Sequence, residues 1–303
     1  PGWALSGSWD GNDKLTREQR PPGPASAHAG TGNRHGTAMS TGTMSPGRAK
    51  ISARTLRTDR WWLPPLLNFA GLTAWVAYAT VRAFQQDNYY VAEYGYLTPF
   101  YSPCFSVGCI PEASHFGQIL PDVWWLPYAA LTLPFLLLFR LTCYYYRKAY
   151  YRAFWLSPPA CAVAEPHGKY TGERRFPLIL QNAHRWALIA SGLIALVLTY
   201  DLVLAFRDET GEWGHAGLGT LIFAVNVFLI WGYTLSCHSC RHLIGGRLRH
   251  FSKHPVRYKA WTWVTKLNAH HARFAWGSLF SVAIADPYVY LLATGTISDP
   301  RFF

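Results

Sequence analysis

Long apolar runs separated by short polar segments dominate the chain after about residue 60. Each run is close to the roughly 20 residues that a helix needs to cross the hydrocarbon core of a bilayer, and none alternates as a barrel strand would. The pattern therefore predicts an all-α membrane protein with five transmembrane helices, at about residues 61–84, 120–145, 176–206, 218–240 and 267–294.

The first 47 residues follow a different pattern, rich in Gly, Ser, Thr and Pro with almost no apolar clustering. Such a segment buries too little surface to offset its ordering entropy. We therefore expect a flexible tail over residues 1–47 and a membrane anchor domain over residues 48–303. The methionines are Met39 and Met44, and the chain opens on Pro1, so we expect Met39 to be the initiator and residues 1–38 to be non-native.

Composition supports a membrane protein and sets its orientation. Half of the residues are hydrophobic, 16% are aromatic and only 15% are charged, whereas a soluble domain carries nearer a quarter charged. The net charge of +12 comes mostly from the stretch before the first predicted helix and from the connections between helices two and three and between helices four and five. Because basic residues mark cytoplasmic segments, we predict a cytoplasmic N-terminus and a C-terminus outside. This bias accounts for the charge without a nucleic-acid partner.

The six cysteines are scattered and do not form a disulfide framework. Cys104 and Cys109 share the long outer loop, where the sequence is compatible either with a disulfide or with two free thiols. Cys143 lies among three tyrosines at the inner end of the second predicted helix. We expect Cys143 to pack in the interior rather than to bind a ligand.

The densest chemistry lies at residues 236–246, SCHSCRHLIGG, where the fourth predicted helix ends. Thiolate and imidazole together suit zinc, copper or an iron–sulfur centre. On a regular helix Cys237 and Cys240 share one face, while His238 and His242 lie roughly a third to a half turn away. Either the helix unwinds at its end or further ligands come from elsewhere. The simpler alternative is a group of polar residues at the place where a membrane helix meets water.

Two other predicted helices bring histidines to the same side of the membrane. His184 lies near the inner end of the third and His271 begins the fifth, while the fourth ends with Cys237 on that side. Ionisable residues within spans are costly and mark functional sites. Asp201 and Asp286 lie toward the opposite ends, where we expect them to pair with water or with each other.

Three motifs together resemble one protein family: Asn182-x-His184-Arg185, the segment 237–246, and Leu267-Asn268-x-x-His271 with Phe274-Ala275-Trp276. They are similar to the single-chain membrane anchor subunits of actinobacterial succinate dehydrogenase, respiratory complex II, over about residues 49–303. The resemblance implies a subunit of the bacterial plasma membrane that docks a flavoprotein and an iron–sulfur subunit on its cytoplasmic face. Electrons from succinate would pass to menaquinone or ubiquinone. The chain shows no dinucleotide or flavin fingerprint, so the succinate-oxidising site is expected on a partner.

For this branch of the family the resemblance suggests a Rieske-type [2Fe–2S] centre, with two thiolates on one iron and two imidazoles on the other. The candidate metal ligands are the thiols of Cys237 and Cys240, then His184 and His271, with His238 and His242 as alternates. A quinone needs donors for its carbonyl oxygens and an apolar slot for its tail. The candidates for that site are Arg185, Asn182, Trp61 and Trp62, with interface anchoring as an equal alternative for the tryptophans.

Other readings of the same residues stay open. A b-type cytochrome would hold one haem between His184 and His271, since no histidine pair at outer depth supports a second haem. A structural anchor would bind zinc through its Cys and His residues and simply recruit soluble subunits. A transporter is disfavoured because no internal repeat or broken helix pair is evident.

Overall fold

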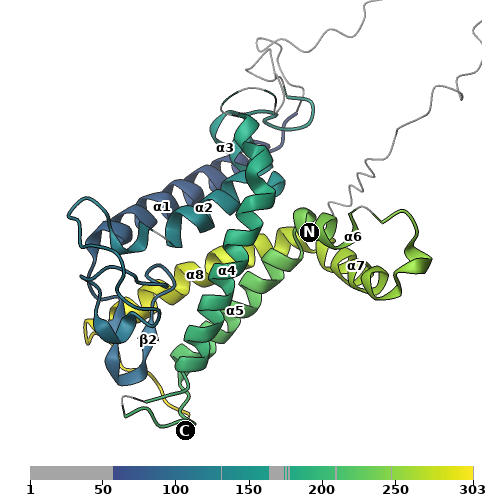
Figure 1. Cartoon of the computed structure of the whole chain (residues 1–303). Coiled ribbons are helices and arrows are strands. Elements are labelled where there is room, and N and C mark those ends of the chain that lie inside the picture. The colour runs from purple at the N-terminus through teal and green to yellow at the C-terminus, as the bar shows by residue number, and fades with distance from the viewer. Residues whose placement is uncertain are drawn as a thin grey trace, which may run out of the picture. The chain divides into compact units, whose positions relative to one another are not determined.

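The structure is a computed structural model that describes residues 57–302, apart from residues 131, 164–173, 175, 177, 209 and 247. The chain separates into two units, Pro1–Gly47 and Arg48–Phe303. The predicted tail, residues 1–47, lies outside the described residues. Figure 1 shows the helices of the second unit.

The described part of the second unit is helical apart from one short antiparallel hairpin, in which Tyr90 pairs with Leu97. Its helices are α1 (Leu63–Gln85), α2 (Thr132–Thr142), α3 (Tyr144–Phe154), α4 (His184–Leu204), α5 (Leu218–Leu235), α6 (His238–Gly245), α7 (Pro255–Asn268) and α8 (His271–Ala293). The strands are β1 (Tyr90–Val91) and β2 (Tyr96–Leu97). Short 3-10 turns lie at Ala92–Tyr94, Pro111–Ala113, Tyr128–Ala130, Leu178–Ala183 and Phe251–Lys253.

The long helices pack side by side. α5 lies along α8, α4 contacts both α2 and α5, and α1 packs on α3. The approach of α5 to α8 depends on Gly232, because a Cβ there would overlap the ring of Phe274. Small residues at helix interfaces are the usual means by which membrane helices come close, since lipid supplies no hydrophobic drive between them.

Within the described residues, three helical stretches are long and apolar enough to cross a membrane: Leu178–Leu204, Leu218–Leu235 and His271–Ala293. They correspond to the third, fourth and fifth predicted helices. α1 coincides in position with the first predicted helix. The total of five spans therefore stays a prediction, whereas a mostly helical fold with membrane-spanning helices is confirmed.

The second predicted helix, at residues 120–145, is wrong at both ends. α2 begins only at Thr132, and the helix is interrupted at Cys143, after which the chain continues as α3. Pro121 and Pro127 explain the late start, because proline lacks the N–H that a helix interior requires. The part of the run that contains these prolines is apolar enough for a membrane helix, but it does not form an α-helix.

The fourth predicted helix also ends early. α5 stops at Leu235, Cys237 has extended backbone angles, and α6 starts a new helix at His238. Of the two alternatives that the sequence left open, the unwound helix end is thus confirmed. The break matters because it frees the Cys237 side chain from the face of α5.

A buried ion pair fastens α8 to α1 at the end of the bundle far from α6. Asp286 accepts a hydrogen bond from Arg82 Nε at 2.8 Å and further hydrogen bonds from the hydroxyls of Tyr78 and Thr98. The side chains of Arg82 and Asp286 are only 4% and 0% exposed. Such a pair is stable because additional donors satisfy the carboxylate that has been removed from water.

Two more buried carboxylates stabilise the same end. Asp201 in α4 accepts from the Ser102 hydroxyl and lies 3.2 Å from Nδ1 of His115. Asp299 accepts from the backbone N–H of Gly219 at 2.8 Å, so a distant residue satisfies one of the free N–H groups in the first turn of α5. Asp201 and Asp286 therefore have separate protein partners, and the pairing with each other that we considered is wrong.

The loop between α1 and α2 packs against the helices at this end of the bundle and shares their core. A disulfide joins Cys104 and Cys109, which decides between the two alternatives compatible with the sequence. Tyr96, Phe100 and Tyr101 of this loop are fully buried. The loop is therefore a packed cap on this end of the bundle.

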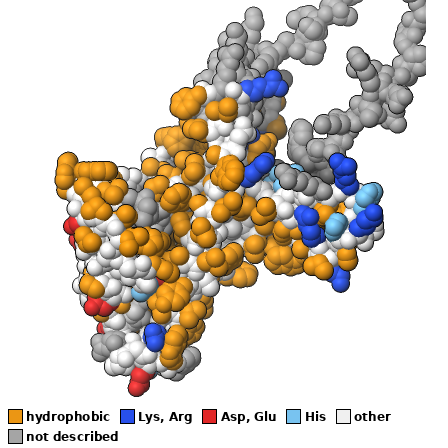
Figure 2. All heavy atoms as spheres, viewed as in Figure 1, with side chains coloured by type: hydrophobic (Ala, Val, Ile, Leu, Met, Phe, Trp, Pro, Cys, Tyr) orange, Lys and Arg blue, Asp and Glu red, His pale blue; other side chains and the backbone are white. Residues whose placement is uncertain are grey.

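Charge is separated along the molecule. Figure 2 shows that most of the visible Lys and Arg side chains gather over α6 and α7, whereas the Asp and Glu side chains lie at the opposite end. This distribution agrees with the bias in the sequence that predicts a cytoplasmic location for the α6–α7 side. The orientation itself stays a prediction.

Replacing Asp286 with alanine should destabilise the fold by about 3–5 kcal/mol, because Arg82 would remain buried without its counter-ion. Thermal unfolding of the purified complex in detergent measures this as a lower melting temperature. The matched control is Asp59→Ala, which breaks the exposed pair with Arg57 and should change little because solvent screens that pair. Equal melting temperatures for the two variants would contradict the proposed stabilising role.

Chemical labelling tests the orientation. Cys161 is the exposed free thiol among the described residues, whereas Cys143, Cys237 and Cys240 are buried. We expect a membrane-impermeant maleimide to label Cys161 in inside-out vesicles and not in intact cells. A Thr210→Cys variant in a Cys161→Ser background reports the opposite face and should show the reverse pattern. Labelling of Cys161 in intact cells would reverse the predicted topology.

Candidate metal centre

Two segments far apart in the chain carry the same order of side chains. Residues 139–147 read FRLTCYYYR and residues 233–241 read YTLSCHSCR. Each has an aromatic residue, then Leu, a hydroxyl residue, Cys, and Arg four residues after the Cys. We refer to them as the first and second Cys segments. The expectation that the chain has no repeat or broken helix pair is therefore wrong at this local scale. The match escaped notice because nine residues are too few to register as a duplicated domain.

Each Cys segment interrupts a helix at its cysteine. Cys143 separates α2 from α3 with φ −65° and ψ 127°, and Cys237 separates α5 from α6 with φ −63° and ψ 141°. The backbone N–H of Arg147 donates to the Cys143 carbonyl at 2.9 Å, and that of Arg241 donates to the Cys237 carbonyl at 3.1 Å. Both cysteines therefore occupy the position just before a helix, and both are buried.

Each of the two histidines begins a helix, His184 in α4 and His271 in α8. Each ring lies flat against the aromatic residue of one Cys segment. His184 stacks on Phe139 with ring centroids 4.8 Å apart and planes within 4°, and His271 stacks on Tyr233 at 5.1 Å and 16°. The stacking restricts each imidazole to one plane.

A hydroxyl of the same Cys segment fixes one nitrogen of each ring. Nδ1 of His184 lies 2.8 Å from Oγ1 of Thr142, and Nδ1 of His271 lies 2.7 Å from Oγ of Ser236. The Asn268 amide donates to the Ser236 backbone carbonyl at 2.7 Å, which ties the end of α7, just before His271, to the end of α5. In both rings, the hydroxyl occupies Nδ1 and leaves Nε2 to face inward.

The thiols contact the histidines crosswise. Nε2 of His184 lies 3.0 Å from Sγ of Cys237, in the second Cys segment, while Nε2 of His271 lies 3.4 Å from Sγ of Cys143, in the first. All four side chains are in or beside one buried cluster at the junction of α2, α4, α5 and α8. We refer to Cys143, His184, Cys237 and His271 as the Cys/His centre.

Burial controls the protonation of the centre. Cys237 lies beyond the last residue of its span, and burial raises the pKa of its thiol to about 12. A thiol in that environment becomes a thiolate only when a bound cation displaces its proton. A fixed positive charge lies next to the second Cys segment, since Arg140 stands over the Tyr233 ring at 5.0 Å and donates to the Tyr146 hydroxyl at 2.6 Å.

The donor set fits a metal centre that takes two sulfur and two nitrogen ligands. A single tetrahedral ion would draw all four donors to within about 4 Å of one another. In the described part of the chain, no three donors of the Cys/His centre lie within 4.8 Å of one another; the group that does is Asp208, Glu212 and His215, which is partly exposed. The donor atoms of the Cys/His centre therefore lie farther apart than those of a site for one ion.

The family described as "Actinobacterial succinate dehydrogenase subunit SdhC" matches residues 63–295, which include all four donors. The chain belongs to this family.

A solved structure supports the assignment. The "Mycobacterium smegmatis Sdh1 complex in the apo form" has a chain that is 62% identical, with a TM-score of 0.79, over 87% of this chain and 99% of that chain. No curated protein sequence matched. The protein is thus a membrane subunit of an actinobacterial succinate dehydrogenase complex, as the sequence motifs predict.

Within this SdhC-family subunit, the predicted ligands separate into two groups. His184, His271 and Cys237 belong to the Cys/His centre, together with Cys143, which we expected to be packing only. Cys143 is buried as expected, but its contact with His271 was missed because its partner lies on a distant helix. The matching Leu-Thr-Cys and Leu-Ser-Cys tripeptides were the signal that could have revealed it.

The other predicted ligands lie along α6. Cys240 is buried in the same apolar cluster as the centre, and burial raises the pKa of its thiol. His238 and His242 face each other on the exposed side of α6, with 2.9 Å between their Nε2 atoms. The geometry thus places His184 and His271, rather than the α6 histidines, against buried thiols.

The residues suggested for quinone binding lie at helix starts. Asn182 and Arg185 flank His184 and are exposed, and Trp61 and Trp62 precede α1, where Trp62 is exposed. Their part in quinone binding stays a prediction.

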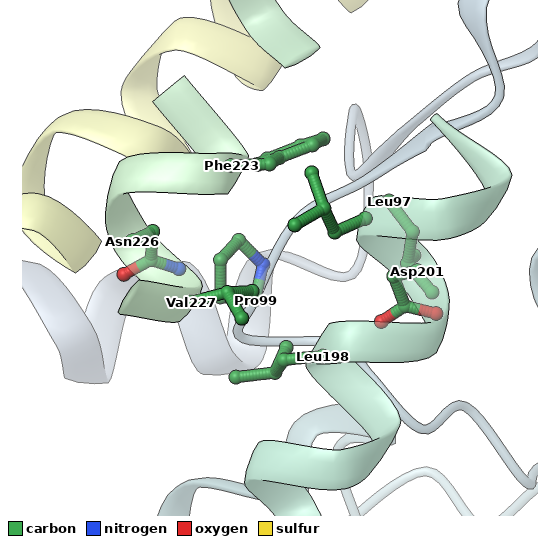
Figure 3. A pocket seen from close by; sticks show the side chains of 8 residues that line it. Leu97, Pro99, Leu198, Asp201, Phe223, Asn226 and Val227 are labelled. Atoms are coloured by element: carbon green, nitrogen blue, oxygen red, sulfur yellow. The ribbon is translucent and has the colours of Figure 1, made fainter. Parts of the chain in front are cut away.

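A small cavity lies toward the other end of the bundle. Figure 3 shows the carboxylate of Asp201 and the amide of Asn226 at its wall, among apolar side chains. Its volume of about 10 Å³ suits roughly one water molecule. It is therefore too small for a quinone ring, and we place no quinone there.

Proposed function

We propose that this subunit anchors the succinate dehydrogenase complex in the bacterial plasma membrane and passes electrons between the soluble subunits and menaquinone. The observation that carries the proposal is the Cys/His centre, in which four soft donors from separate helices converge in a buried site. Isolated polar residues at a helix end would need neither burial nor matched orientation. A centre that only stabilised packing would also not need both imidazole Nε2 atoms aimed at sulfur.

The centre is suited to a Rieske-type [2Fe–2S] cluster, which requires two thiolates and two imidazoles. Cys143 and Cys237 would supply the thiolates, and His184 and His271 the imidazoles. Such a cluster, when bound, accepts and releases one electron at a potential that imidazole ligation raises. In this proposal Cys143 replaces Cys240 as the second thiolate, because Cys143 contacts a histidine of the centre.

Residues around the centre would orient the ligands and exclude water. Thr142 and Ser236 hold the Nδ1 atoms, so that Nε2 of each ring is the nitrogen available to a metal, and partners of this kind strengthen metal binding. Phe139 and Tyr233 cover the ring faces. The Arg140 guanidinium supplies positive charge that would offset the charge of bound thiolates.

The alternatives fit the geometry less well. A zinc ion would need all donors around one point, whereas the centre is spread more widely. A single haem between His184 and His271 would need their Nε2 atoms free for axial ligation, but each faces a cysteine sulfur within 3.4 Å. Both contacts favour a centre in which sulfur and nitrogen share the same metal group.

The basic surface supports docking of partner subunits. Cations gather over α6, α7 and their connection (Figure 2), and the exposed ones include Arg249, Lys253, Arg257, Lys259 and Lys266. Complementary charge steers and orients an acidic partner. We assign this surface to the flavoprotein and iron–sulfur subunits, of which the flavoprotein would carry the succinate-oxidising site.

A quinone at Arg185 would lie next to the centre, because Arg185 directly follows His184 in the first turn of α4. Its guanidinium and the Asn182 amide offer hydrogen-bond donors for the carbonyl oxygens. Trp61 and Trp62 would contribute apolar contact to the same site or anchor α1 at the membrane interface.

Two cysteine variants test the ligand set. We expect Cys143→Ser to abolish the electron paramagnetic resonance signal of the anchor, while the signals of the soluble iron–sulfur subunit persist, and to lower the iron content of the purified complex, since serine is a poor ligand for this centre. Cys240→Ser is the matched control and should keep both. The soluble subunits must still co-purify, which shows that the anchor has folded. Loss of iron from Cys240→Ser alone would restore the pair that the sequence suggests, Cys237 and Cys240.

Absorption and metal analysis of the same preparation separate the cofactor alternatives. We expect the preparation to contain more iron than the soluble subunits account for, and this extra iron should exceed the zinc content. We expect no sharp Soret band. Replacing His184 and His271 together with alanine should then remove the signal of the anchor and abolish quinone reduction. A Soret band that vanished in this double variant would instead establish the single-haem cytochrome.

A further inference from the structure

The two Cys segments match at most positions but differ in one hydroxyl group. The first has Phe139 and the second has Tyr233, and each stacks on its own histidine. Tyr233 therefore adds a phenolic oxygen that the matched position lacks. The repeat makes the difference informative, because stacking alone is already achieved by phenylalanine.

Tyr233 is only 2% exposed, and its hydroxyl forms no hydrogen bond of good geometry with any residue that the structure describes. Leaving a buried donor unpaired costs about 1–3 kcal/mol, so such groups in folded proteins need an explanation. Phenylalanine would fill nearly the same space without this cost. The hydroxyl is thus explained best by a partner that forms only when the centre is loaded.

The neighbouring groups identify that partner. Cys143 lies near the Tyr233 hydroxyl without forming a hydrogen bond of good geometry to it. Its sulfur contacts His271, the ring on which Tyr233 stacks. The nearby Arg140 is already committed to the Tyr146 hydroxyl and to Oγ of Ser278. A thiol is a weak acceptor, whereas a metal-bound thiolate carries negative charge and accepts more strongly.

We propose that Tyr233 is a positioning residue whose hydroxyl donates a hydrogen bond to the Cys143 sulfur of the loaded centre and raises its reduction potential. The inference rests on the proposed function and deepens it. A reduced iron–sulfur centre carries one more negative charge than the oxidised one, so a donor to its sulfur stabilises the reduced form more. Hydrogen bonds to the sulfurs are among the factors that set the potential of such centres.

The experiment is a redox titration of the intact complex in membranes, followed by electron paramagnetic resonance. We expect Tyr233→Phe to retain its iron and to lower the midpoint potential, changing the ratio of oxidised to reduced centre by roughly tenfold, or about 59 mV for a one-electron couple. The control is Tyr101→Phe, a buried tyrosine at the other end of the bundle whose hydroxyl donates to the Arg82 carbonyl. This control should leave the potential within a fraction of that shift.

The outcomes separate this inference from the function on which it rests. An unchanged midpoint in Tyr233→Phe, with the signal intact, overturns the inference and leaves the iron–sulfur centre standing. A wild-type complex with no iron signal from the anchor overturns both. If Tyr233→Phe loses its iron, 3-fluorotyrosine at position 233 decides, because it keeps the ring and is a stronger donor: a raised midpoint supports the inference and an unchanged one refutes it.

Discussion

The crossed contacts between two helix breaks and two helix starts are the constraint on which the half of the protein around the Cys/His centre depends. His184 is held by the hydroxyl of one Cys segment and contacts the thiol of the other, and His271 does the reverse. Neither segment can shift without disturbing both histidines. The register of α2, α4, α5 and α8 is therefore coupled through four side chains, in a medium where hydrophobic burial cannot set helix positions by itself.

The two ends of the bundle are stabilised in different ways. The end with the disulfide and the hairpin uses buried carboxylates, each satisfied by hydroxyl, guanidinium or backbone donors. The end with the Cys/His centre uses thiols and imidazoles, and both imidazole Nε2 atoms face a cysteine sulfur. The first arrangement is complete within the chain, as expected of a structural element, while in the proposed function a metal group would complete the second.

The local repeat also explains how a membrane protein can place four ligands from separate helices at one depth. A cysteine inside a helix must point along one face, but a cysteine just before a new helix is released from that face. Both Cys segments use this position, and both histidines occupy the first turn of their helices. The phenolic hydroxyl of Tyr233 then breaks the equivalence of the two halves.

The sequence by itself determined the helical membrane class and the polarity of charge, because hydropathy and basic residues act locally, and it singled out Cys237, His184 and His271 as candidates. Its motifs also identified the family. Tertiary structure decided that Cys143 joins the centre, that prolines shorten the second predicted helix, and that Asp286 pairs with Arg82. These outcomes depend on which distant side chains meet after packing, and helix register sets those meetings. No periodicity along one segment encodes the register of another.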